Sequence, residues 1–180
     1  MGAVKRQTIV EPAELAALVE KLAASIVAEG AGIEESAIVG IHTRGVPLAA
    51  RLAAILNGRW GIRVELASMD ITLYRDDLSD VASQPEVRAT RIDFDVSGKR
   101  IILVDDVLFT GRTARAAISE LLDFGRPGRI ELAVLIDRGH QELPIRADHV
   151  GKKVETKASQ KVEVHLKEID GEDGVFLAGD

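Results

Sequence analysis

Short apolar runs alternate with longer stretches of helical periodicity along most of the chain. Strand-length runs occupy residues 37–41, 63–69, 101–104 and 129–136. The run at 101–104, Ile-Ile-Leu-Val, has no polar interruption, which is typical of a strand buried on both faces of a parallel sheet. Helical spacing predicts helices at residues 12–29, 48–57 and 114–124. This alternation favours an α/β fold with a central, mainly parallel sheet flanked by helices.

Two other stretches depart from this alternation. Residues 70–91 mix charged and polar residues with little periodicity, and loops of this length are usually lids or unstructured segments, so we predict a mobile arm. Residues 161–166 alternate like a final strand, and residues 169–180 are interpreted as an acidic, glycine-rich tail. At 180 residues, the chain is expected to form a single domain over residues 1–180.

The most informative polar residues directly follow the run at 101–104. Asp105 and Asp106 come first, and the turn Thr110-Gly111-Arg112-Thr113 then opens a helical pattern. Carboxylates accept hydrogen bonds from vicinal hydroxyls, and a helix N-terminus favours phosphate, so together they suit a ribose phosphate. Taken separately, two acids are often only a solvated loop and a Thr-Gly turn only a helix start.

A second candidate loop follows the run at 37–41. Thr43, Arg44 and Gly45 could bind a diphosphate, because glycine allows close backbone approach and arginine offers a bidentate fork. Considered alone, this segment would be interpreted as an ordinary loop. His42 is interpreted as a packing residue, since the sequence supplies no partner for acid–base chemistry.

Composition limits the classes of function. Lysine and arginine number 23 against 29 aspartates and glutamates, so the net charge of −6 does not indicate a nucleic-acid binder, although a local basic face stays open. Cysteine is absent, which excludes disulfides and thiol chemistry. Residues 1–8 show no signal-peptide pattern and no apolar run could cross a membrane, so we expect a cytoplasmic protein.

The segment 100–113, RIILVDDVLFTGRT, resembles the phosphoribosyl-pyrophosphate (PRPP) signature of type I phosphoribosyltransferases. That signature is an apolar strand, two acids, apolar residues, then Thr-Gly and a hydroxyl residue. The resemblance implies catalytic roles for Asp105 and Asp106. It implies PRPP binding by both acids and by Thr43, Arg44, Gly45, Thr110, Gly111, Arg112 and Thr113. It also implies that the arm at 70–91 closes over the site, with Arg75 as the candidate cation of this lid.

Residues 137–152, DRGHQELPIRADHVGK, together with MDITLYRDDLS at 69–79, resemble pyrimidine-operon attenuation regulators that are also uracil phosphoribosyltransferases. This resemblance implies conversion of uracil and PRPP to UMP and pyrophosphate. It implies a small hood at about 137–160, with Asp137 and Arg138 helping to bind uracil. Mg²⁺ would be bound mainly through PRPP, with no metal site made by protein alone. A homodimer or homotetramer is expected.

The same family binds a hairpin in pyrimidine-operon messenger RNA when UMP is bound. The matching basic positions are Lys21, His140, Arg146 and Lys152. Three features depart from the family pattern: Gln141 replaces an arginine, residues 20–25 (EKLAAS) carry one basic side chain, and VETKAS at 154–159 replaces a Pro-Thr-Ser turn. These departures favour the enzyme over the regulator. Two alternatives stay open: an RNA-binding regulator with vestigial catalysis, and a type I transferase for another base, such as guanine or orotate.

Overall fold

The computed structural model describes residues 6–30, 32–72 and 89–179. Its main sheet has five strands in the order β3-β2-β4-β5-β6. The strands are β2 (Ser36–Ile41), β3 (Glu65–Met69), β4 (Arg100–Leu108), β5 (Arg129–Asp137) and β6 (His149–Lys153). All neighbouring pairs are parallel, which confirms the predicted type of sheet. β4 lies at the centre and extends beyond the predicted run, so Asp105 and Asp106 belong to the strand itself.

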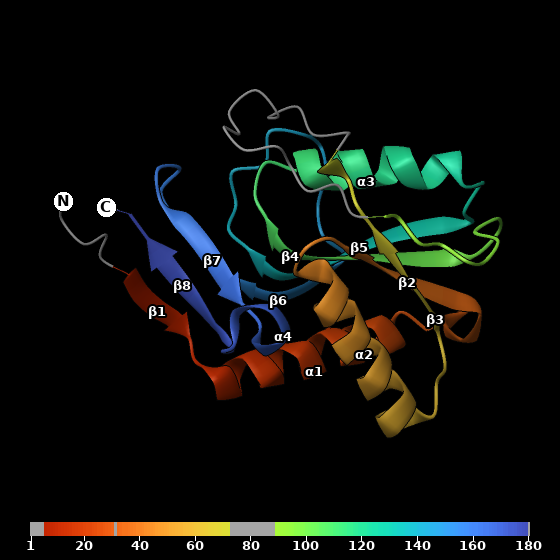
Figure 1. Cartoon of the computed structure of the whole chain (residues 1–180), viewed down its shortest axis with the longest axis horizontal. Helices are drawn as coiled ribbons and strands as arrows, with labels where there is room; N and C mark the ends of the chain where they lie inside the picture. Colours follow the sequence, from red (N-terminus) through yellow and green to blue (C-terminus); the bar gives the residue numbers. More distant parts are fainter. Residues whose placement is uncertain (1–5, 31, 73–88, 180) are drawn as a thin grey trace.

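Helices cover both faces of this sheet. In Figure 1, α1 (Pro12–Ala28) and α2 (Gly45–Trp60) lie on one face and α3 (Arg112–Asp123) on the other. Side chains alternate along β4: Ile102 and Val104 pack with the first two helices, whereas Ile101 and Leu103 pack with α3. The uninterrupted apolar run is explained by these two cores, because each face of the strand needs its own apolar side chains.

A second, antiparallel sheet joins the two ends of the chain. Its order is β1-β8-β7, formed by β1 (Arg6–Val10), β8 (Gly174–Ala178) and β7 (Lys161–His165). A short helix, α4 (Lys167–Asp170), connects β7 to β8, and a 3-10 turn (Ile33–Glu35) precedes β2. The prediction of a tail at residues 169–180 was wrong, because β8 pairs on both sides and buries Val175 in the core.

The range 137–160, predicted to form a hood, contains β6, an edge strand of the main sheet. This range therefore belongs to the main sheet and not to the small antiparallel sheet. Ser68 and Arg91 exchange backbone hydrogen bonds of 3.1 and 2.8 Å, which brings the two flanks of the predicted arm together beside β3. Arg75, the candidate lid residue, lies outside the described residues. None of the helices in the described part of the chain has the length and apolarity needed to span a membrane.

Candidate active site

Asp105 and Asp106 lie near the carboxyl end of β4 and are both half-buried. One Asp105 carboxylate oxygen accepts a 2.9 Å hydrogen bond from the Asp106 amide, and Asp106 accepts one of 2.9 Å from the Val107 amide. Burial raises the pKa of Asp106, although a hydrogen bond with Asp105 and the charge of Arg44 act in the opposite direction. The strand end therefore presents two carboxyl groups that interact with each other.

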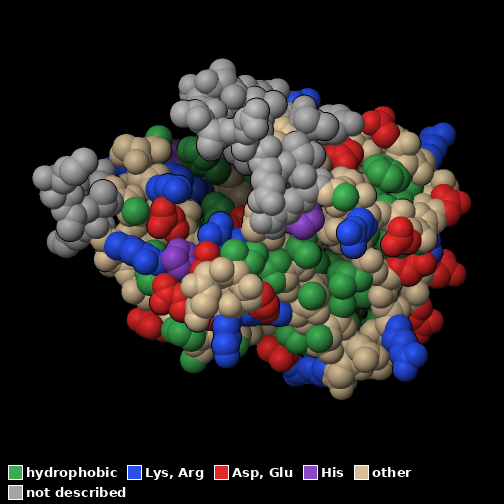
Figure 2. Space-filling model, viewed as in Figure 1, with side chains coloured by type: hydrophobic (Ala, Val, Ile, Leu, Met, Phe, Trp, Pro, Cys, Tyr) green, Lys and Arg blue, Asp and Glu red, His purple; other side chains and the backbone are tan. Residues whose placement is uncertain are grey.

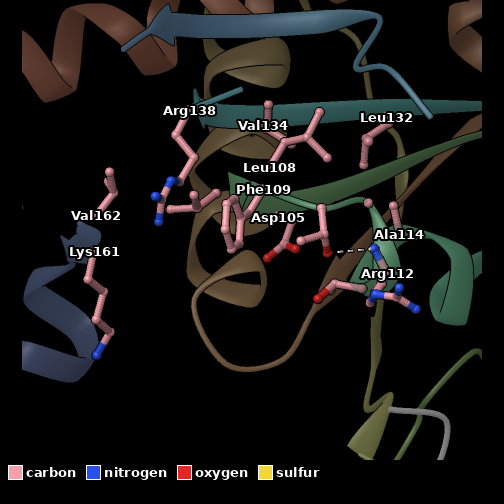
Figure 3. Close-up of a pocket in the computed structure, with 14 residues that line it drawn as sticks. Asp105, Leu108, Phe109, Arg112, Ala114, Leu132, Val134, Arg138, Lys161 and Val162 are labelled. Carbon is pink, nitrogen blue, oxygen red and sulfur yellow. Dashed lines mark hydrogen bonds between the residues drawn. The ribbon is translucent and has the colours of Figure 1, made fainter. Parts of the chain in front are cut away.

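The turn that follows β4 leads directly into the N-terminus of α3. Gly111 caps α3 with a φ of 90°, in the left-handed region that glycine adopts without strain. The Arg112 amide lies 3.4 Å from the Thr110 hydroxyl oxygen (dashed in Figure 3). Backbone amides at the start of a helix lack intrahelical acceptors, so this turn can bind an anion.

The loop at 43–45 meets the same end of the sheet. It follows β2, which pairs directly with β4, and Arg44 occupies the N-cap of α2. Gly45 presses against β4 so closely that a Cβ there would lie 2.2 Å from the Val104 carbonyl oxygen. The Arg44 guanidinium acts electrostatically on Asp106, so the two loops predicted from sequence are brought together. Arg44 also forms a salt bridge with Asp170, at 2.8 Å.

A cavity of about 640 Å³ lies beside the acids and the turn. Its lining residues are Asp105, Val107, Leu108, Phe109, Thr110, Gly111, Arg112, Thr113, Ala114, Leu132, Val134, Arg138, Lys161 and Val162. Figure 3 shows Lys161 and Val162, from β7, across the cavity from Arg112 and Ala114. The cavity thus has polar groups at the turn and apolar walls from β4, β5 and β7.

Several lining residues were not singled out from the sequence. Val107, Leu108 and Phe109 lie inside the signature segment, where their apolar character was the only signal. Lys161 and Val162 belong to a predicted strand, but nothing local indicates that this strand reaches the cavity. Conversely, Thr43, Arg44, Gly45, Asp106 and Asp137 are not among the lining residues of this cavity.

The two candidate uracil residues are held by other groups of the protein. Arg138 is buried, donates hydrogen bonds to the Thr156 hydroxyl (3.2 Å) and the Lys157 carbonyl (3.0 Å), and stacks 4.0 Å above the Phe109 ring. Burial lowers the pKa of Arg138. Asp137 accepts hydrogen bonds from the Gly139 amide and the Gln141 side chain and lines a second cavity of about 370 Å³. Arg138 lines both cavities.

Of the four candidate RNA-binding residues, Lys21, His140 and Arg146 are exposed and Lys152 is partly buried. Lys21 donates to the Gly151 carbonyl at 2.7 Å, and Lys152 contacts the Glu14 carboxylate at 2.7 Å and the Ile9 carbonyl at 3.2 Å. His140 contacts the Thr156 carbonyl at 2.6 Å, while Arg146 lines the second cavity. Acidic and basic side chains are interspersed on the face shown in Figure 2.

Comparison with known proteins decides the family. Residues 6–169 match the model of the phosphoribosyl transferase domain. The chain belongs to the phosphoribosyltransferase family, in its PyrR branch. The protein is 58% identical to a bifunctional protein PyrR of Thermus thermophilus over 87% of both chains, and 53% identical to that of Deinococcus deserti over 96% and 94%. These matches confirm the resemblance drawn from the two sequence segments.

Solved phosphoribosyltransferases confirm the fold. A hypoxanthine-guanine phosphoribosyltransferase from Bacillus anthracis aligns over 99% of this chain and 100% of its own, with a TM-score of 0.70 and 17% identity. A hypoxanthine phosphoribosyl transferase from Trypanosoma cruzi gives a TM-score of 0.74 with 15% identity, over 100% and 94% of the two chains. In this phosphoribosyltransferase, the cavity beside the signature turn is the candidate active site.

Proposed function

We propose that this protein transfers the phosphoribosyl group of PRPP to uracil at the cavity beside β4. The observation that carries the proposal is the cavity itself, because it brings Asp105 and the turn 110–113 together with apolar walls. In this cavity, Asp105 can accept hydrogen bonds from ribose hydroxyls and the turn 110–113 can bind the phosphate. A flat base can pack against Val107, Phe109 and Val162. Uracil is assigned by similarity to PyrR-type regulators.

The chemistry requires no covalent nucleophile. The bond from ribose carbon 1 to the diphosphate breaks, uracil N1 forms the new bond to that carbon, and the N1 proton leaves to solvent. Carbon 1 becomes more positive as the diphosphate departs, so the negative charge of Asp105 and Asp106 stabilises this carbon. The turn 110–113 fixes the 5′-phosphate, and the loop 43–45 receives the diphosphate. Holding PRPP in this orientation relative to uracil lowers the activation barrier further.

Mg²⁺ fits this arrangement as a partner of the substrate. Among the described residues, no group of three or more His, Cys, Asp or Glu side chains could hold a metal ion. Mg²⁺ is commonly held by one or two carboxylates together with substrate phosphate oxygens, and Asp105 and Asp106 can provide the carboxylates. When bound, Mg²⁺ would offset the negative charge of the leaving diphosphate.

The choice of base is tested by product analysis. We expect UMP from uracil and PRPP, with guanine and orotate giving little product under the same conditions. Conversion of guanine or orotate but not uracil would assign the cavity to another base. Absence of any nucleotide product from folded protein would instead favour a regulator with vestigial catalysis.

We also infer UMP-dependent binding to pyrimidine-operon messenger RNA, as the similarity to PyrR proteins implies. Lys21 and Lys152 already contact backbone carbonyls, and Lys152 also pairs with Glu14. Each phosphate contact adds to the salt-dependent part of RNA affinity, so we expect weaker binding than that of a relative with the full basic set. Equal affinity at matched salt would refute this expectation.

A further inference from the structure

The segment 166–173, here called the C-terminal clamp, is joined to α2 by two arginines. Arg51 donates to Glu168 at 2.8 and 2.6 Å and to Asp173 at 3.0 and 2.7 Å. Asp173 also accepts a 2.8 Å hydrogen bond from the Lys167 amide, so its carboxylate is fixed by its own segment. The clamp is therefore anchored to the helix that follows the loop 43–45.

The second arginine of this junction is Arg44. Its Nε and Nη2 donate to the two carboxylate oxygens of Asp170 at 3.1 and 2.8 Å. Asp170 is 13% exposed and accepts a further 2.8 Å hydrogen bond from the Leu166 amide. The hydrogen bonds from Arg44 lower the pKa of Asp170, which therefore stays charged at neutral pH.

The orientation of this pair leaves part of the guanidinium for another anion. An arginine has five N–H donors, and Asp170 engages the edge formed by Nε and Nη2. The other edge of the fork has the geometry that suits two phosphate oxygens. Arg44 also lies at the N-cap of α2, where the first amides of the helix favour the same anion.

We propose that Asp170 is a positioning residue that aligns Arg44 for the diphosphate of PRPP. The inference rests on the proposed function and adds a residue from the clamp that contacts no substrate itself. A long arginine side chain samples many rotamers when unrestrained, and a fixed partner on one edge removes that freedom before the ligand arrives.

The test is Asp170→Asn, assayed with magnesium pyrophosphate by calorimetry and with both substrates by steady-state kinetics. We expect about tenfold weaker pyrophosphate binding and a similar rise in KM for PRPP, with KM for uracil unchanged. Asp170→Glu, which keeps the charge, should recover part of the loss. Unchanged or tighter pyrophosphate binding by Asp170→Asn would overturn the proposal.

Asp173→Asn is the matched control, because it removes one carboxylate charge and the acceptor for Arg51 Nη1 in the same clamp without touching Arg44. The remaining amide oxygen can still accept from Arg51 Nη2 and the Lys167 amide. An equal loss of pyrophosphate binding in both variants would show a purely structural role and overturn the proposal. In an Arg44→Gln background, Asp170→Asn should have no further effect. Wild-type protein that binds pyrophosphate but forms no UMP would contradict the proposed function, while the binding comparison would still decide the role of Asp170.

Discussion

At the scale of single residues, we expect the protonation of Asp106 to make substrate binding depend on pH. Its raised pKa arises from burial and is opposed by the hydrogen bond with Asp105 and by Arg44. Hydroxyls of a ribose donate to the charged carboxylate, so substrate binding favours loss of the proton. The affinity for PRPP should therefore decrease as the pH is lowered through the raised pKa of Asp106.

We predict a measurable proton release when PRPP binds in mildly acidic solution, above the ordinary aspartate pKa of 3.8. Calorimetric titrations in two buffers with different heats of ionisation should give different apparent enthalpies. Asp106→Asn should reduce that difference. Identical enthalpies for the wild type in both buffers would show that Asp106 is already charged before binding.

The close approach of Gly45 to β4 gives a second prediction at this scale. Gly45→Ala would place a Cβ 2.2 Å from the Val104 carbonyl oxygen, so we expect a loss of about 1–3 kcal/mol in stability and weaker pyrophosphate binding. Gly58→Ala in the same helix is the control, because a Cβ there meets nothing within 4 Å and alanine favours the helix. Urea unfolding should separate the two variants. Equal stabilities would contradict the steric argument.

The grouping of candidate residues was predictable where neighbours in sequence are also neighbours in space. The two acids and the turn 110–113 form one continuous segment, so chain order alone suggested a ribose-phosphate site. The partner of Arg44 was not predictable, because Asp170 is 126 positions away and no local pattern connects them. The stacking of Arg138 on the Phe109 ring likewise could not be predicted from the sequence.

At the scale of elements, β4 and β5 are tied to β6 by a buried polar network. Arg100 donates two 2.8 Å hydrogen bonds to the Glu131 carboxylate, which also contacts His149 at 2.8 Å. The other His149 ring nitrogen lies 2.8 Å from the Ser25 hydroxyl of α1. Burial of Glu131 raises its pKa, but the hydrogen bonds from Arg100 and His149 outweigh burial, so the net shift is downward.

We predict that Glu131→Gln destabilises the protein by about 3 kcal/mol at neutral pH, because it leaves the buried Arg100 without its charged partner. The charged Glu131 carboxylate contributes to the free energy of unfolding above its pKa in the unfolded chain, about 4.5. This contribution is lost as the pH falls through the lower pKa that Glu131 has in the folded protein. The deficit of the variant should therefore shrink in strong acid. Glu29→Gln, in an exposed pair with Arg129, should change stability little. Similar unfolding free energies for both variants would contradict a stabilising network.

Elements with strong local patterns were predicted well, and those defined by distant pairing were not. The apolar run in β4 and the helical spacing in α1 are local signals, and both predicted elements form, although β4 continues to Leu108, beyond the predicted run. β8 was interpreted as tail because its flanks are acidic and rich in glycine, whereas its strand conformation depends on pairing with β1 and β7. Such pairing cannot be inferred from one short segment.

At the scale of the whole molecule, the candidate active site lies where the two sheets approach each other. β4 of the parallel sheet supplies Asp105, the turn after it supplies residues 110–113, and β7 of the small sheet supplies Lys161 and Val162 on the opposite wall of the cavity. The C-terminal clamp connects these parts through Arg44 and Arg51. We therefore expect catalysis to depend on the C-terminal part of the chain as well as on the signature segment.

We expect RNA affinity to depend on the number of cationic side chains that reach RNA phosphates. We predict that Gln141→Arg strengthens binding to a pyrimidine-operon hairpin in the presence of UMP. One added phosphate contact should steepen the slope of log affinity against log salt by about 0.7–0.9. Filter binding across a salt series measures both effects, with Gln141→Lys as a second cationic variant. An unchanged slope and affinity in both variants would place residue 141 outside the RNA interface.

The central claim is that uracil and PRPP react at the carboxylates of β4, and UMP formation by the wild type and Asp106→Asn tests it most directly. We predict UMP from the wild type and a decrease of about 100-fold or more in kcat/KM for the variant. Burial raises the pKa of Asp106 in the folded protein, so the protonated carboxyl group stabilises the fold and this contribution is lost as the pH rises. The Asp106→Asn variant should therefore be at least as stable as the wild type at neutral pH. Wild-type turnover by the folded variant would contradict the assigned site, and a folded wild type that forms no UMP would contradict the assigned reaction.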